Sequence, residues 1–329
     1  MKILLIGLGS IGKRHLTNIL ALGYKDVTVV SRSGILPEPF QALPVFINVE
    51  AALDAERFDA AILCTPTALH EEPLLALLEH KILNIYIEKP VSHQYGKMDE
   101  ILELASGYEN NIIVGFDLHF DPGLQKVKEL LGSDIIGKPL SANAQVGQYL
   151  PDWRPTEDYR QGMSAKKVTG GGVMLDLVHE FDYLLWLMGS AQTIACQYAH
   201  TNDLQIETED VAEVLIRFEN GGTGTIHLDY WQQKLVRNCL ITGTEGSIFW
   251  DLATSSVKWI NRNKEENVFD YTGFVRNDRF VAIMKTFLEG GKDDRLTSLQ
   301  NGIASLKMVL AAKQSSEKQI FVPLQSFKP

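Results

Sequence analysis

A glycine-rich turn close to the start of the chain sets the strongest limit on its fold. Glycines at positions 7, 9 and 12 follow a short apolar run, residues 3–6, and precede an amphipathic stretch, residues 11–22. Between a strand and a helix, this spacing permits a tight turn and lets the phosphates of a ligand approach the backbone closely. The N–H groups and the positive dipole of the helix N-terminus favour the same phosphates. The sequence therefore predicts a dinucleotide-binding turn formed by Gly7, Gly9, Ser10, Ile11 and Gly12.

The first third of the chain alternates short apolar runs with helical stretches. Amphipathic helices are predicted at residues 11–22, 70–79 and 95–106, and strands at 2–7, 26–31, 59–64, 84–89 and 111–116. This alternation is typical of βαβ units, in which helices cover both faces of a parallel sheet. We therefore predict an α/β N-terminal domain of the Rossmann type, with a doubly wound parallel sheet, over residues 1–118.

A different pattern begins at about residue 119. Helices are predicted at 123–131 and 175–188, a strand at 140–146, and between them a long irregular stretch rich in aromatic residues. From 193 to 260, apolar and polar residues alternate in short runs broken by glycine-containing turns, which is the pattern of antiparallel hairpins. We predict an α+β C-terminal domain over residues 119–329, with a largely antiparallel, open-faced sheet and a last helix at 296–312.

The segment Ser31-Arg32-Ser33, at the end of the second predicted strand, indicates the kind of dinucleotide. An Asp or Glu at this position bonds the ribose hydroxyls of NAD and would repel a 2′-phosphate. Here the Arg32 guanidinium can pair with a phosphate, and the hydroxyls of Ser31 and Ser33 can donate to its oxygens. The missing carboxylate favours NADP(H) over NAD(H), although enzymes that use NAD can also carry an arginine nearby.

The composition argues against several classes of function. The formal net charge of -10 disfavours a broad phosphate-binding surface for DNA or RNA. Cys64, Cys196 and Cys239 lie far apart and form neither a CxxC pair nor a cluster with histidines, so we expect reduced thiols and no metal site. No segment approaches the roughly 18 to 20 apolar residues that cross a bilayer. We expect a cytoplasmic protein without nucleic-acid or membrane partners.

Residues at the carboxyl ends of two predicted strands extend the predicted cofactor site, because ligands bind at that edge of a parallel sheet. Glu88 and Lys89 end one strand and precede a proline, which places Lys89 beside the nicotinamide. Thr65 and Pro66 follow another strand, and His70 begins the next helix. These residues are expected to line the ribose and nicotinamide half of the cofactor.

Several segments, taken together, resemble the Gfo/Idh/MocA oxidoreductases, named for glucose-fructose oxidoreductase and inositol dehydrogenase. They are GLGSIGKRH from residue 7, CTPTALH from residue 64, EKP from residue 88 and GGGVMLDLVHEFDYLLWLMG from residue 170. Each stands in the expected order and separation, and the resemblance covers nearly the whole chain. It implies the same two-domain fold, a nicotinamide cofactor and a catalytic group drawn from both domains.

The resemblance assigns the catalytic roles to Lys89, Asp176 and His179. A histidine titrates in the range needed to take the proton of an alcohol, while a lysine can hold the substrate oxygen and stabilise its alkoxide character. The family usually spaces this Asp and His four positions apart, whereas here they are three apart and Glu180 takes the fourth position. Asp182 preserves the His-x-x-Asp spacing and so favours His179, and the role of Asp176 stays open.

Substrate contacts are predicted in two stretches. The family commonly has a polar, arginine-bearing strand end at the position of residues 116–122, where this chain has a histidine. The long irregular stretch carries aromatic and polar side chains, which suit the apolar faces and polar edges of a sugar ring or could instead cover the core. The predicted substrate-binding residues are Lys89, His119, Tyr149, Trp153, Arg154, Tyr159 and His179.

These features predict an oxidoreductase that acts on the hydroxyl or keto group of a sugar, cyclitol or nucleotide-linked sugar. The segment GQYLPDWRP, from residue 147, resembles a subgroup associated with bacterial surface-carbohydrate pathways. Two alternatives are a redox-neutral hydrolase or epimerase that recycles a bound nicotinamide, and a noncatalytic NADP(H)-binding regulator. The open face of the predicted sheet and the family resemblance both predict a homodimer or homotetramer.

Overall fold

The fold is described from a computed structural model, for residues 1–107, 111–290 and 293–328. The chain divides into two compact units, which are treated separately below. Unit 1 contains Met1–Asp117 and Arg276–Ile303, and unit 2 contains Leu118–Val275 and Ala304–Pro329. The chain therefore passes from unit 1 to unit 2, returns to unit 1 at residues 276–303 and ends in unit 2. The predicted division at residue 118 did not assign this returning segment to the first domain.

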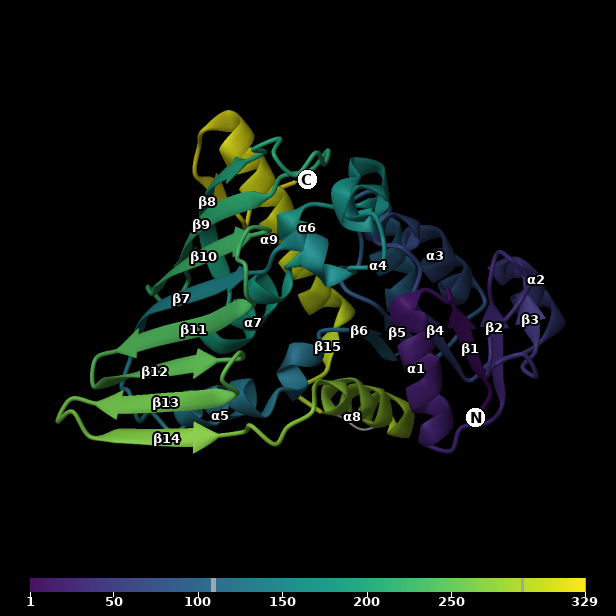
Figure 1. Ribbon diagram of the computed structural model, residues 1–329, viewed down its shortest axis with the longest axis horizontal. Coiled ribbons are helices and arrows are strands. Elements are labelled where there is room, and N and C mark those ends of the chain that lie inside the picture. Colours follow the sequence, from purple (N-terminus) through teal and green to yellow (C-terminus); the bar gives the residue numbers. More distant parts are fainter. Residues whose placement is uncertain (108–110, 291–292, 329) are drawn as a thin grey trace. The chain divides into compact units, whose positions relative to one another are not determined.

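Unit 1 is built on sheet A, whose strand order is β15-β6-β5-β4-β1-β2-β3 (Figure 1). All neighbouring strands in it are parallel except β15 and β6. Every residue of β1, β2 and β4 is buried, as expected for strands that are covered on both faces. The predicted parallel sheet is confirmed. Its strands are β1 (Ile3–Ile6), β2 (Val27–Val30), β3 (Val45–Phe46), β4 (Ala60–Leu63), β5 (Asn84–Ile87), β6 (Asn111–Val114) and β15 (Thr297–Ser298).

The helices of unit 1 form two groups. α1 packs against α8, while α3 packs against α2 and α4. From β1 the chain first crosses toward β3 and then returns to build the sheet toward β6, so right-handed crossovers place the two groups on opposite faces. The predicted helices correspond to α1, α3 and α4, whereas α2 and α8 were not predicted. The helices are α1 (Ser10–Ala21), α2 (Val49–Ala55), α3 (Glu71–Glu79), α4 (Met98–Ser106) and α8 (Arg276–Glu289).

Unit 2 is built on sheet B, whose strand order is β14-β13-β12-β11-β7-β10-β9-β8-β16. Its neighbouring strands are antiparallel except β7 and β10, which are parallel. The predicted largely antiparallel sheet is therefore confirmed. The strands are β7 (Pro139–Gly147), β8 (Ala191–Ala199), β9 (Val211–Phe218), β10 (Thr223–Asp229), β11 (Val236–Gly243), β12 (Gly246–Asp251), β13 (Ser256–Asn261), β14 (Glu266–Asp270) and β16 (Val322–Pro323).

Helices cover one face of sheet B. α5 (Pro122–Gly132) packs on β12 and β13, and α7 (His179–Met188) packs on β7 and β10. The last part of α9 (Leu299–Lys318) lies along β8, where Ser315 and Ser316 accept hydrogen bonds from the strand (Figure 1). The predicted last helix began at residue 296, but β15 occupies that position because residues 297 and 298 pair with β6.

The predicted single helix at 175–188 is wrong. The structure has a short helix α6 (Val173–Asp176) and then α7, with Leu177 between them at φ -100° and ψ 36°. Asp176 and His179 therefore do not share one continuous helical face. Before α6, the irregular stretch forms four short 3-10 turns, at Leu150–Trp153, Tyr159–Gln161, Met163–Ala165 and Lys167–Thr169.

The other face of sheet B is open. Exposed and buried residues alternate along β9 and β10, as expected for strands with one solvated face. The strand register aligns a row of side chains across this face, which we call the open-face row. In order, it consists of Ala195, Leu215, Thr225, Asn143, Leu240, Phe249 and Lys258.

Across the described ranges, every helix is too short or too polar to span a lipid bilayer.

Candidate active site

The glycine turn lies where the strand order of sheet A reverses, between β1 and β4. Gly7 has a φ of +93°, and a Cβ on it would lie 2.8 Å from the carbonyl carbon and oxygen of Cys64. A Cβ on Gly12 would lie 2.0 Å from the carbonyl oxygen of Gly7. A side chain at either position would therefore force apart the loops that follow β1 and β4. Ligands bind at such switch points in open α/β sheets.

The N-terminus of α1 fits the phosphates of a dinucleotide. The residue before the helix, Gly9, has extended dihedral angles and contributes no capping side chain. Gly9 and Ser10 are exposed, and a Cβ on Gly9 would meet no atom within 4 Å. Ile11 is half-buried and Gly12 is buried beneath the turn. The first N–H groups of the helix thus lack a side-chain cap beside an open space, an arrangement that can hold phosphate.

A tight turn follows β2. The N–H of Gly34 donates to the carbonyl of Ser31 at 2.9 Å, and the hydroxyls of Ser31 and Ser33 lie 3.1 Å apart. Arg32 is exposed at the tip of this turn. Two hydroxyls and one guanidinium are therefore presented together, and the segment 31–33 has no carboxylate that would repel a phosphate.

His70 connects the ends of two strands of sheet A. Its Nε2 lies 2.9 Å from the carbonyl oxygen of Thr65, and its Nδ1 lies 3.0 Å from that of Pro90. The ring is only 1% exposed, and burial lowers the pKa of His70 despite these hydrogen bonds. Thr65 is half-buried and Pro66 is exposed. His70 thus positions the loops after β4 and β5 through main-chain contacts.

Glu88 and Lys89 follow β5 directly. Glu88 is 8% exposed, and its carboxylate contacts the buried ring of His15 on α1 at 2.6 Å. Lys89 is half-buried. Because β5 is parallel to β4, Lys89 lies at the same edge of sheet A as Thr65. The structure therefore brings Gly7, Gly12, Thr65 and Lys89 to one edge of the sheet, as the sequence predicted.

In unit 2, two of the three consecutive glycines before α6 are needed for close packing. A Cβ on Gly171 would lie 2.4 Å from the carbonyl oxygen of Met163. Gly172 has a φ of +116°, and a Cβ there would lie 2.5 Å from the carboxylate of Glu209. Glu209 in turn pairs with Lys313 at 3.1 Å and accepts the Val173 N–H on its carbonyl. These contacts fix the start of the helix that carries Asp176.

Asp176 is held by a tyrosine that the sequence did not single out. The hydroxyl of Tyr230 donates to Asp176 Oδ2 at 2.6 Å, and Tyr230 is fully buried. Burial raises the pKa of Tyr230 well above its usual value, and the charge of Asp176 adds to this effect. The ring of Trp153 meets that of Tyr230 edge-on at 5.4 Å. Tyr230 directly follows β10. A tyrosine at the end of a strand with alternating apolar and polar residues does not indicate from sequence alone that it bonds a distant aspartate.

His179 begins α7 and is buried, with 6% of its surface exposed. The next residue, Glu180, is fully buried and accepts hydrogen bonds from the Arg237 guanidinium at 2.9 and 3.1 Å. Because Glu180 is engaged in this ion pair, it is a poor candidate for the catalytic role predicted for Asp176 or His179. Arg237 lies on β11, far from Glu180 in sequence, so only the fold reveals the pair.

His119 supports α7 from inside unit 2. Its Nε2 lies 2.8 Å from Asp182 Oδ2, and its ring stacks on Trp186 with centroids 4.2 Å apart. His119 is 3% exposed. Burial raises the pKa of Asp182, although the charge of His119 opposes the shift. The Asp182 of the His-x-x-Asp spacing therefore binds His119, and these contacts position the helix that begins with His179.

The remaining predicted substrate residues lie along the irregular stretch. Trp153 is half-buried, and its indole N–H donates to the carbonyl of Gln148 at 3.2 Å. Tyr149 is half-buried beside Trp231, and Tyr159 is half-buried at the start of a 3-10 turn. Arg154 is exposed and lies 3.5 Å from Glu157. Trp153 is the member of this group that the structure brings near Asp176, through Tyr230.

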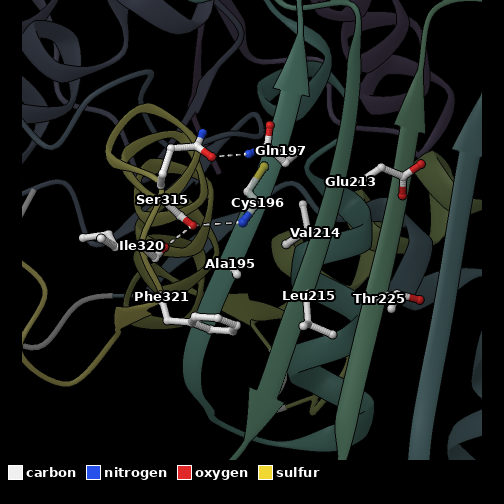
Figure 2. A pocket seen from close by; sticks show the side chains of 11 residues that line it. Ala195, Cys196, Gln197, Glu213, Val214, Leu215, Thr225, Ser315, Ile320 and Phe321 are labelled. Atoms are coloured by element: carbon white, nitrogen blue, oxygen red, sulfur yellow. Dashed lines mark hydrogen bonds between the residues drawn. The ribbon is translucent and has the colours of Figure 1, made fainter.

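Two hollows of unit 2 are lined by residues other than these. One, of about 420 Å³, lies between the end of α9 and strands β8 to β10, with Phe321 beside Ala195 and Leu215 (Figure 2). The other, of about 510 Å³, is lined by His227, Trp231 and Lys234 among others. Both border the open face rather than Asp176 and His179.

No group of three or more His, Cys, Asp or Glu side chains within the described part of the chain is arranged to hold a metal ion. The three cysteines are buried free thiols.

Comparison with known proteins identifies both units. Residues 1–116 match the oxidoreductase family with an NAD-binding Rossmann fold, and residues 124–249 match the GFO/IDH/MocA C-terminal domain. The chain is 25% identical to the myo-inositol 2-dehydrogenase of Thermotoga maritima, over 99% of each sequence.

Solved structures of similar fold extend this comparison. A levoglucosan dehydrogenase in complex with NADH and levoglucosan has a TM-score of 0.86, with 18% identity and 98% of each chain covered. The WlbA dehydrogenase of Bordetella pertussis, in complex with NADH and UDP-GlcNAcA, has a TM-score of 0.80, also with 18% identity and 98% of each chain covered.

Proposed function

Because this chain belongs to the Gfo/Idh/MocA family of oxidoreductases, we propose that it transfers a hydride between NADP(H) and the hydroxyl or keto group of a sugar, cyclitol or nucleotide-linked sugar. The observation that carries this proposal is the edge of sheet A. There a glycine turn that fits a dinucleotide and a lysine with fixed neighbours follow strands of one parallel sheet. A binding protein without catalysis would need the turn but not the lysine.

Three side chains are proposed to carry the chemistry. In the oxidation direction the substrate carbon loses a hydride to the nicotinamide, and its hydroxyl loses a proton. Lys89, from unit 1, holds the substrate oxygen and stabilises its developing negative charge. His179, from unit 2, accepts the hydroxyl proton as general base and returns it in the reverse direction. Asp176, fixed by Tyr230, orients the substrate or the histidine.

The cofactor contacts are proposed from unit 1. Gly7, Gly9, Ser10, Ile11 and Gly12 would hold the pyrophosphate at the N-terminus of α1. Ser31, Arg32 and Ser33 would hold the 2′-phosphate of NADP(H), which their turn supports through two neighbouring hydroxyls and an exposed guanidinium. Thr65, Pro66 and Lys89 would line the nicotinamide half, and His70 and Glu88 would position them.

The substrate class is proposed from the relatives and from unit 2. Myo-inositol, levoglucosan and a UDP-linked sugar are the ligands or substrates named for three similar proteins, and each carries several ring hydroxyls. Trp153 offers an aromatic face near Asp176, which suits the apolar face of a sugar ring. Tyr149, Arg154 and Tyr159 would contribute further contacts from the same stretch. A role in bacterial surface-carbohydrate synthesis is part of this proposal.

The assembly is proposed to be a homodimer or homotetramer of a cytoplasmic protein. The open-face row presents Leu215, Leu240 and Phe249 to solvent at 45%, 36% and 37% exposure. Between Leu215 and Leu240 the row holds two polar side chains, Thr225 and Asn143, which bond each other at 2.8 Å. A row of mixed apolar and polar side chains on an open sheet face is suited to pack against a second copy of the chain.

The experiment that tests the function is a turnover assay with purified protein. Inositols, anhydrosugars and UDP-linked sugars are each mixed with NADP+ or NAD+, while nicotinamide absorbance and sugar products are followed. Reduction of the nicotinamide in step with a keto product supports the proposal. A changed sugar without a net absorbance change would indicate a redox-neutral enzyme instead, and cofactor binding without any turnover would indicate a regulator.

A further inference from the structure

A buried cluster of side chains in unit 1 joins α1 to the residue before Lys89. Nε2 of His15 lies 2.6 Å from a carboxylate oxygen of Glu88, and the hydroxyl of Tyr86 donates to the same oxygen at 3.2 Å. His15 and Tyr86 are fully buried. The glycine turn and the EKP segment were recognised in the sequence as separate motifs, and this cluster connects them physically.

The cluster holds Glu88 as a carboxylate. Burial opposes its ionised form, but the hydrogen bond and charge of His15 and the charge of Lys89 outweigh burial and lower the pKa of Glu88. A carboxylate only accepts hydrogen bonds, so Nε2 of His15 carries the proton between them. Lys89 therefore has a fixed negative charge as its neighbour in the chain.

The position of His15 on α1 ties this charge to the glycine turn. His15 lies three residues after Gly12, so both face the same side of the helix, and both are buried. Gly12 contacts the carbonyl of Gly7, and His15 contacts Glu88 less than one helical turn further on. The His15 ring also packs edge-on against Tyr86 and Phe280, with centroids 5.2 and 6.0 Å away. These neighbours restrict its rotation.

Lys89 is thus flanked by two anchored residues. Glu88 is held by His15 and Tyr86, and the carbonyl of Pro90 is held by Nδ1 of His70 at 3.0 Å. A lysine side chain has high rotamer entropy. The space that its ammonium group can occupy is restricted only if the backbone of the lysine is fixed. Hydrogen bonds on both sides provide that constraint, and the Glu88 carboxylate further restricts the ammonium by attraction.

We propose that His15 and Glu88 form a positioning pair, which holds the Lys89 ammonium in place relative to the glycine turn. This inference rests on the proposed function, in which Lys89 acts on the substrate oxygen. An ion pair with a purely structural role would contribute to folding stability without affecting the reactivity of Lys89.

The first experiment compares variants in steady-state kinetics across pH. H15L removes the donor, whereas H15Q keeps an N–H at about the place of Nε2, and E88Q keeps the shape of Glu88 but removes its charge. H15L is expected to lower kcat about tenfold to a hundredfold, and H15Q to restore most of it. E88Q is expected to move the alkaline limb of kcat/KM to lower pH, because it removes the negative charge beside Lys89. NADPH affinity should stay within a few-fold of wild type.

The matched control is R279Q, because Arg279 and Asp117 form another buried ion pair of unit 1, at 2.9 Å. R279Q is expected to lower the melting temperature without changing kcat or its pH dependence. The proposal is overturned if H15L and R279Q lower both Tm and kcat alike, if H15Q restores nothing, or if E88Q leaves the pH profile in place.

A second experiment requires no substrate and separates this proposal from the proposed function. Acetylation of Lys89 by an N-hydroxysuccinimide ester is measured by mass spectrometry, with the exposed Lys25 as internal reference. Lys89 should be acetylated several-fold faster in E88Q than in the wild-type protein. The increase in rate should be smaller in H15L, and the rate in H15Q should equal that of the wild type. If K89A leaves turnover intact but this pattern holds, the proposed function fails while the pair stands. Equal Lys89 rates in all proteins would refute the pair.

Discussion

Sheets A and B make their functional residues available in different ways. The central strands of sheet A are buried on both faces, so only their ends are accessible, and Gly7, Thr65 and Lys89 all lie at carboxyl ends. Sheet B has one face covered by helices and one open face. Asp176 and His179 lie on helices of the covered side, while Leu215 and Leu240 lie on the open side.

This difference underlies the two proposed roles, chemistry at the edge of sheet A and assembly on the open face of sheet B. In the central strands of sheet A, β1, β2 and β4, every side chain is buried in the core, so a ligand site is built from the loops at one edge. In sheet B half of the side chains are left outside the core and are available for assembly. Substitutions at the edge of sheet A should therefore alter chemistry and cofactor binding, and substitutions on the open face should alter assembly.

The largest effect is expected at the two side chains proposed to be catalytic. Lys89→Ala and His179→Ala should each lower turnover by about a hundredfold or more, because they remove electrostatic stabilisation and general base catalysis. Steady-state kinetics and NADPH titration measure this. NADPH affinity should stay near wild type, and turnover that survives either substitution would contradict the catalytic assignment.

Asp176→Asn and Tyr230→Phe test the hydrogen bond between these two residues of unit 2. Each should lower turnover less than His179→Ala, since they disturb one hydrogen bond of 2.6 Å rather than removing the base. Similar losses in the two variants would indicate that the bond acts as a unit. A loss in Asp176→Asn as large as in His179→Ala would instead give Asp176 a direct part in proton transfer.

The next effect concerns cofactor choice at the edge of sheet A. Arg32→Ala should lower the affinity for NADPH relative to NADH by about tenfold, because it removes the charge that pairs with the 2′-phosphate. Fluorescence titration of both cofactors gives the ratio, and Lys25→Ala serves as an exposed, charge-matched control. Equal affinity of the wild-type protein for the two cofactors would refute the 2′-phosphate site.

A smaller effect is expected on the open face. Leu240→Asp introduces a charge in the middle of the open-face row and should shift a dimer or tetramer toward smaller species at micromolar concentration. Light scattering measures the shift, and Val168→Asp, at a residue 76% exposed on the irregular stretch, is the control. If the wild-type protein is a monomer, or if Leu240→Asp leaves its assembly unchanged, the proposed role of the open face in assembly is wrong.

The smallest effect is expected from His227 on the open face. Hydrogen bonds to Asp229 and Glu213 raise the pKa of His227 to about 9, against a burial effect that lowers it. Its contribution to stability is therefore present in full below about pH 6.5 and is lost as the pH rises through about 9. His227→Gln should lower Tm by about 2 °C at pH 6 and much less at pH 10, since partial exposure screens the pair. Equal shifts at both pH values would contradict the ion pair.

The sequence predicted the elements of sheet A well because their signals are local. Strands such as Ile3–Ile6 and Ala60–Leu63 are uniformly apolar, and the glycines mark the turn directly. The short strand Val45–Phe46 and the helix Arg276–Glu289 escaped prediction. The first has only two residues, and the second belongs to unit 1 although it lies far from it in sequence.

The candidate site was predicted less completely than the fold. The positions of Lys89, Asp176 and His179 follow from motifs, but the partners of these segments do not. Tyr230 bonds Asp176 across 54 positions, and His15 bonds Glu88 across 73. The break at Leu177 also escaped prediction, because an apolar run of helical period continues through it.

The strand and helix periods, the glycine turn, the missing carboxylate at residues 31–33 and the family resemblance could all be predicted from the amino-acid sequence. Tertiary structure alone decided that Glu88 is a buried, ionised anchor, that Glu180 and Asp182 are engaged by Arg237 and His119, and that Tyr230 holds Asp176. The physical reason is that a motif records which groups are present along the chain. Their charge state and orientation depend on burial and on partners that only folding brings within hydrogen-bond distance.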